Sequence, residues 1–162
     1  MDIIIRNAVI DDCERIRPLQ KEIACLHRKG RPDLFKSEAR YFTREAFAER
    51  LDDPKHTVLI AETDTGEAVG YVFARIVSHR NHPTYINFDC FYIDDICVKK
   101  SYQRNGIGKK LLERCKEEAE KNKCKMLELS VWEFNKDAIA FYESCKMTTQ
   151  VRRMEFRLED TK

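Results

Sequence analysis

The segment from residue 96 to residue 110 constrains this chain most, because an apolar strand runs there through a polar loop into an amphipathic helix. Gly106 and Gly108 stand where that helix begins, and a backbone without Cβ atoms lets an anion approach closely. Free backbone N–H groups at a helix start and the helix dipole both attract negative charge. Basic side chains of the same segment add to this attraction: Arg104, Lys109 and Lys110. The segment therefore predicts an anion-binding turn.

The hydrophobic periodicity predicts a mixed α/β fold. Strands are expected at Ile3–Ile5, Thr57–Ala61, Ala68–Val77, Tyr85–Val98, Met126–Val131 and Val151–Leu158. Helices are expected after Asp11 or Asp12, after Thr43, over Gly106–Asn122 and over Lys136–Ser144. A turn at Asp64–Glu67 makes the second and third strands an antiparallel hairpin, so the sheet begins antiparallel and continues through a β-α-β crossover. With 162 residues, a single domain over 1–162 is expected.

Composition argues against several classes of protein. A net charge of +2 predicts neither a nucleic-acid partner nor a membrane-binding face. No apolar run approaches the roughly 20 residues that span a bilayer, and the N-terminal residues do not resemble a signal peptide. The seven cysteines are scattered without a C-x-x-C pair, and His79 and His82 lie in a polar connection. We therefore expect a cytoplasmic protein with reduced thiols and no metal.

Two motifs resemble those of a known family. Gln103–Gly108 reads Q-x-x-G-x-G, which resembles the acyl-CoA motif of the GCN5-related N-acetyltransferase (GNAT) superfamily, and Asn135–Glu143 resembles the second signature, N-x-x-A-x-x-F-Y-E. The family usually continues with a glycine and an aromatic residue, where this chain has Cys145, Lys146 and Met147. The resemblance extends more weakly over nearly the whole chain. It implies a GNAT-like mixed sheet, splayed open and flanked by helices.

The resemblance also implies acetyl-CoA as the acyl donor. The backbones of Ile96 and Val98 would pair with the amides of the cofactor, the glycine turn would hold its pyrophosphate, and Asn135 would flank the pantetheine arm. Cys97 is expected to turn its side chain into the core, and Phe141 either contacts the cofactor or packs in the core. The expected cofactor-binding residues are Ile96, Cys97, Val98, Gln103, Arg104, Asn105, Gly106, Ile107, Gly108, Lys109, Asn135 and Phe141.

Acetyl transfer to an amine needs a base for the amine and a proton for the departing thiolate. Tyr142 is the expected acid, as in the family, because a phenol with an ordinary pKa near ~10 stays protonated at neutral pH. Asp94 is the first candidate for the base, since simple alternation places its side chain on the strand face of Ile96. A bulge would exchange it with Asp95, and water is a further alternative. Both carboxylates could instead bind a cationic substrate or cap the sheet.

The acceptor is expected to be a small-molecule or peptide amine, covered by the helix and loop of Leu26–Lys36, although the sequence does not identify it. Two other interpretations remain open: an acyl-CoA-binding regulatory module without catalysis, and a nucleotide-binding protein that uses the same turn. A homodimer through Val151–Leu158 would be compatible with the pattern, but no sequence feature requires one.

Overall fold

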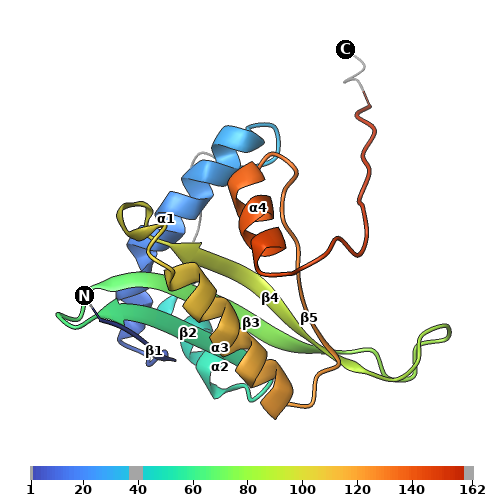
Figure 1. Cartoon of the computed structure of the whole chain (residues 1–162), viewed down its shortest axis with the longest axis horizontal. Coiled ribbons are helices and arrows are strands. Elements are labelled where there is room, and N and C mark those ends of the chain that lie inside the picture. Colours follow the sequence, from blue (N-terminus) through green and yellow to red (C-terminus); the bar gives the residue numbers. More distant parts are fainter. Residues whose placement is uncertain (1, 37–41, 159–162) are drawn as a thin grey trace. The chain divides into compact units, whose positions relative to one another are not determined.

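The computed structural model describes residues 2–36 and 42–158, and the chain divides into two compact units, Met1–Ser130 and Val131–Lys162. The first unit is a five-stranded sheet in the order β1-β2-β3-β4-β5 with helices on both faces (Figure 1). Its strands are β1 (Ile3–Asn7), β2 (His56–Thr63), β3 (Ala68–Ser78), β4 (Asp89–Val98) and β5 (Met126–Leu129). The first four strands pair antiparallel, and β5 lies parallel to β4. The expected meander and β-α-β crossover are confirmed.

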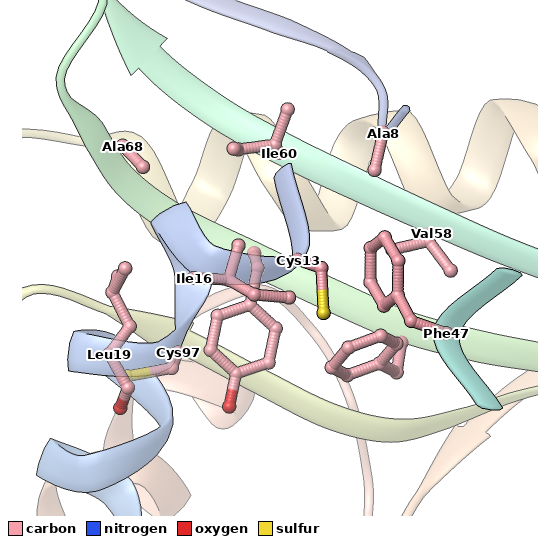
Figure 2. Packing of buried hydrophobic residues seen from close by; sticks show 11 residues of the cluster. Ala8, Cys13, Ile16, Leu19, Phe47, Val58, Ile60, Ala68 and Cys97 are labelled. Atoms are coloured by element: carbon pink, nitrogen blue, oxygen red, sulfur yellow. The ribbon is translucent and has the colours of Figure 1, made fainter. Parts of the chain in front are cut away.

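Helices α1 (Asp12–Gly30) and α2 (Arg44–Asp52) pack on one face of this sheet. Figure 2 shows Cys13, Ile16 and Leu19 of α1 pointing at the strands, with Phe47 of α2 beside them. The same cluster contains Tyr71 and Phe73 of β3 and Cys97 of β4, which are almost completely buried. Pro18 lies inside α1, and the helix continues past it to Gly30.

Helix α3 (Ile107–Lys121) covers the other face. Its buried side chains fall on one stripe, as the sequence predicts: Ile107, Leu111, Leu112, Cys115 and Ala119. Gly70 of β3 faces this helix, because a Cβ at that position would meet Leu111 Cδ1 at 3.1 Å. Residues of β3 that alternate with Tyr71 and Phe73 therefore point toward α3, and those two point toward α1 and α2.

Two strands are shorter than predicted. The strand expected from Tyr85 begins at Asp89, and residues 85–88 belong to a loop in which rings stack on histidines. His79 stacks on Phe88 at a centroid distance of 4.6 Å, and His82 on Tyr85 at 4.2 Å. These contacts use the aromatic residues that made the segment resemble a strand. Strand β5 likewise ends at Leu129, two residues before the predicted end.

The second unit contains helix α4 (Lys136–Ser144), as predicted. The closing strand predicted at Val151–Leu158 is wrong: these residues form no regular element. Val151, Met154, Phe156 and Leu158 are each at least 78% exposed. An alternating pattern favours a strand only where a neighbouring strand offers hydrogen bonds and apolar contacts, and no such strand pairs with these residues in the described structure.

None of the helices in the described ranges has an apolar stretch long enough to cross a bilayer.

Candidate functional site

A β-bulge interrupts β4 in the middle of the sheet. Phe73 pairs with Asp95, but the next residue, Ala74, pairs with Ile93, so Asp94 has no partner in β3. Pairing between β4 and β5 also stops at this point, since its last pair joins Ile93 to Leu129. A bulge bends a strand and increases its local twist. The inserted residue therefore coincides with the place where β4 and β5 separate.

The bulge turns two neighbouring carboxylates toward the face covered by α1 and α2. Asp95 accepts a hydrogen bond of 2.5 Å from the Tyr71 hydroxyl. Asp94 accepts a hydrogen bond of 2.9 Å from Nε of Arg75 and forms an ion pair of 3.5 Å with Arg50 of α2. The expectation that Asp94 shares the strand face of Ile96 is therefore wrong, because alternation fails where a residue is inserted.

The two carboxylates have different surroundings. Both oxygens of Asp94 face guanidinium groups. Asp95 is partly buried beside Tyr71, and this burial raises its pKa, although the bond from Tyr71 and the nearby charge of His27 act in the opposite direction. Burial lowers the pKa of His27, against the raising effect of Asp95. Asp95 is therefore more basic than an ordinary aspartate, since a buried anion is less stable than a solvated one.

The backbone of β4 beyond the bulge is open on the side away from β3. The amide of Lys99 donates to the Val69 carbonyl at 2.8 Å. Because antiparallel hydrogen bonding alternates, the backbones of Cys97 and Asp95 also face β3, whereas those of Ile96 and Val98 face away. In the described part of the chain no strand pairs with that second side beyond Ile93. Ile96 and Val98 thus lie where an extended ligand could be added as a strand.

A tight turn follows the open edge and leads into α3. The short helix η1 (Lys100–Tyr102) is followed by Arg104 at φ 66° and Gly106 at φ 77°, both in the left-handed region. Amides in such a sequence of conformations point into one concavity. Within the described residues the N–H groups from 104 to 109 donate to no protein acceptor, and the first amide used in α3 is that of Lys110. These amides could donate to an anion, and the anion site itself stays a prediction.

Side chains around the turn fix its shape. Gln103 donates from Nε2 to the Val98 carbonyl at 3.0 Å, so its amide holds the turn against the end of β4. Asn105 donates to the Tyr102 carbonyl at 3.2 Å. The Tyr102 hydroxyl donates to Glu67 in the β2–β3 turn. Ile107 is buried, whereas Gly108 is partly exposed and Lys109 is exposed, which leaves the start of α3 accessible to a ligand.

Cys97 lies in the core, as expected. Its side chain is 8% exposed, and the thiol donates to the Leu19 carbonyl at 3.6 Å. Burial raises its pKa to about 12. A thiol that remains protonated at neutral pH is a poor nucleophile. Its backbone and its side chain both point away from the open edge, so Cys97 contacts neither of the features that suit a cofactor.

The remaining predicted residues belong to the second unit. Asn135 caps α4, with its side-chain oxygen accepting from the Ala138 amide at 3.2 Å. Phe141 and Tyr142 lie side by side at the end of the helix, 5.2 Å between ring centroids. Lys146 has φ 65°, and the Met147 amide donates to the Tyr142 carbonyl at 3.0 Å. Lysine thus takes the left-handed conformation that glycine usually supplies in this helix-ending motif.

His27 belongs to the segment Leu26–Lys36 that was predicted to cover the acceptor. Three other residues of the bulge region were not identified from the sequence: Tyr71, Arg50 and Arg75. They come from β3 and α2, and no spacing in the sequence joins them to Asp94 or Asp95. The described residues contain no group of three or more His, Cys, Asp or Glu side chains placed to hold a metal ion.

Comparison with known proteins finds acetyltransferases in both the family models and the curated sequences. The model of the "Acetyltransferase (GNAT) family" matches residues 21–147. Thialysine N-epsilon-acetyltransferase from Bos taurus is 29% identical over 145 residues, 88% of this chain and 82% of that protein. L-ornithine N5-acetyltransferase from Arabidopsis thaliana is 38% identical over 78 residues, 48% of this chain and only 33% of that protein. The crystal structure of a mutant protein from Bacillus halodurans is 30% identical, with a TM-score of 0.91 over 96% of this chain and 99% of that one.

Proposed function

This chain belongs to the acetyltransferase (GNAT) family, and on that premise we propose that it transfers an acetyl group directly from acetyl-CoA to a primary amine within a ternary complex. The observation that carries the proposal is the open edge of β4 at Ile96 and Val98, which runs directly into the anion-binding turn. A pantetheine arm has amides that can pair with a strand edge, and its pyrophosphate suits free backbone N–H groups.

The turn from Gln103 to Lys109 would bind the pyrophosphate mainly through its backbone, with Arg104 and Lys109 adding positive charge at exposed positions. Gln103 would act by shaping the turn rather than by touching phosphate, because its amide is used by Val98. Asn135 and Phe141 would contact the pantetheine arm. The family model extends over both compact units, which supports a single acetyltransferase domain over 1–162.

We assign the base to Asp95 rather than to Asp94. The amine must lose a proton before its nitrogen can attack the thioester carbon. Asp95 is the carboxylate whose pKa is raised by burial, and it lies next to Ile96 at the open edge. Asp94 has both oxygens facing arginines. As the new C–N bond forms, the C–S bond breaks, and Tyr142 would donate a proton to the thiolate of CoA.

The acceptor would be a small-molecule amine. The two curated relatives compared above are named for ornithine and thialysine, and both of these substrates carry a primary amine on a short chain.

All seven cysteines are free, which suits the reducing conditions of the cytoplasm. The homodimer stays a prediction, which the sedimentation of the purified chain tests.

The decisive experiment is mass-detected acetyl transfer across a panel of amines, with Tyr142→Phe as the test variant. We expect transfer to at least one small amine, sequential initial-rate kinetics, and a fall in kcat of about 10²-fold for Tyr142→Phe. The matched control is Tyr85→Phe, which changes an exposed tyrosine in the loop between β3 and β4 and should leave kcat unchanged. Binding of acetyl-CoA without transfer to any amine would contradict the proposed function.

A further inference from the structure

Two arginines enclose Asp94 on the face of the sheet to which Asp95 also points. Nε of Arg75 lies 2.9 Å from one carboxylate oxygen, and a terminal nitrogen of Arg50 lies 3.5 Å from the other. Two guanidinium groups against one carboxylate leave a local net charge of +1 around Asp94. The neighbouring carboxylate of Asp95 offsets this charge only when it is ionised, and the chemistry described above does not use the two arginines.

Aromatic rings hold both guanidinium groups in place. The Arg50 Cζ lies 4.5 Å from the centroid of the Phe42 ring and 5.4 Å from that of Phe73, and the Arg75 Cζ lies 5.6 Å from that of Tyr92. Cation–π contacts of this length position a guanidinium without using its N–H groups. The side chain of Arg50 is 23% exposed and that of Arg75 is 47% exposed, so both reach the surface.

Most N–H groups of this arginine pair have no acceptor. A guanidinium has five N–H donors, yet within the described residues Arg75 donates only through Nε and Arg50 makes no hydrogen bond, only the ion pair. Because both side chains reach the surface, water can satisfy these donors in the free protein, and an anion that binds there replaces that water. The planar fork of arginine fits a carboxylate with two parallel hydrogen bonds. A single excess positive charge also matches a carboxylate better than a phosphate with its charge of nearly −2.

We propose that Arg50 and Arg75 bind the carboxylate of the acceptor, so that the acceptor is an amino acid with a primary amine on its side chain. This inference rests on the proposed function. Asp94 lies between the two arginines and would accept from the α-ammonium group, since a carboxylate offers more acceptor sites than two arginines use. The cluster then complements both charges of the amino acid's backbone end, and the side-chain amine extends toward Asp95.

Matched pairs of acceptors test this directly: L-lysine against 1,5-diaminopentane, and L-ornithine against 1,4-diaminobutane. Each pair differs only in the carboxylate. We expect kcat/KM for the amino acid to exceed that for the diamine by about 10- to 100-fold, the range of a hydrogen-bonded ion pair, and the difference to lie mainly in KM. O-phosphoethanolamine compared with ethanolamine measures the response to phosphate, and its ratio should be smaller.

Two variants assign the preference to the arginines. Arg50→Gln and Arg75→Gln should each bring the lysine-to-diamine ratio toward one. Arg44→Gln is the matched control, because this exposed arginine of α2 pairs with Asp11 and should leave the ratio unchanged. Protection by acetyl-CoA in a thermal shift assay shows that each variant is folded.

A wild-type ratio at or below one, a larger phosphate ratio, or a ratio insensitive to both substitutions would overturn the inference. Absence of transfer to every amine would instead overturn the proposed function, whereas efficient transfer to diamines alone would overturn only the carboxylate site.

Discussion

Replacing Asp95 by asparagine separates its proposed catalytic role from its structural one. Asparagine keeps an oxygen that can accept from the Tyr71 hydroxyl, which donates at 2.5 Å in the wild-type protein. Changing a charged acceptor for a neutral one costs about 1 kcal/mol. Removal of a buried charge offsets this cost, because burial raises the pKa of Asp95 and so disfavours its anion. We expect the free energy of unfolding to change by no more than about 1 kcal/mol.

The effect on catalysis should be much larger. Loss of a general base lowers the rate by about 10²- to 10⁴-fold, or about 2.7 to 5.4 kcal/mol of transition-state stabilisation. Because the folded-state pKa of Asp95 is raised, its base form should disappear as the pH falls through a value above the ordinary pKa of aspartate. The wild-type plot of kcat/KM against pH should therefore fall on its acid side, and Asp95→Asn should lack that descent.

The assay is acetyl transfer measured by mass between pH 5 and 9, together with urea unfolding of each protein. Asp94→Asn is the matched control, since it removes a neighbouring charge whose oxygens face arginines. We expect it to raise KM for a carboxylate-bearing acceptor while retaining the acid descent. The assignment of the base would be refuted if Asp95→Asn turned over within threefold of wild type while Asp94→Asn lost 100-fold.

Three further predictions concern the turn, the buried thiol and the N-terminal ion pairs. Gly106→Ala should lose about 1 kcal/mol of stability and raise KM for acetyl-CoA; Gly66→Ala, with the same left-handed strain in a different turn, should lose similar stability without the change in KM. Cys97→Ala should retain sequential kinetics and most of kcat, because the buried thiol stays protonated; a loss of all transfer would contradict the assignment of Cys97 to the core. Asp12→Asn should lower the free energy of unfolding by about 2 to 3 kcal/mol at pH 7, measured in urea. Burial alone would raise the pKa of Asp12, but the hydrogen bonds from Arg6 and a backbone amide lower it overall, so this difference should shrink below about pH 4 as aspartate becomes protonated.

The sequence predicted best the helices whose caps and apolar stripes lie within the helix itself. Lys136–Ser144 was predicted to the residue, and α3 to within one residue at each end. Both have a cap or glycine at the start and an apolar stripe of helical period. Val151–Leu158 has an equally regular alternation and forms no strand. A helix satisfies its own backbone hydrogen bonds, whereas a strand depends on a neighbour that a local pattern cannot identify.

The anion-binding turn was predictable for a similar reason. Its geometry depends on consecutive residues, and Gly106, which the sequence places where the helix begins, has φ 77°. The surroundings of the proposed base were not predictable in this way. Asp94 and Asp95 point toward the same face because of a one-residue register shift against Phe73, more than twenty positions earlier in the chain. Period-two alternation contains no information about where an extra residue is inserted.

The bulge and Gly70 together explain why the open edge and the turn adjoin. The bulge ends the pairing with β5 at Ile93, which exposes the backbone of Val98 five residues later. Gly70 lies opposite Val98 in the register, and a Cβ there would meet the Cys97 carbonyl and Leu111 of α3, each at 3.1 Å. This is closer than ordinary van der Waals contact, so a larger residue would require the Leu111 side chain or the backbone of β4 to shift by a few tenths of an ångström. The absence of a side chain at Gly70 therefore lets α3 pack closely against the end of β4, where the strand edge and the turn meet.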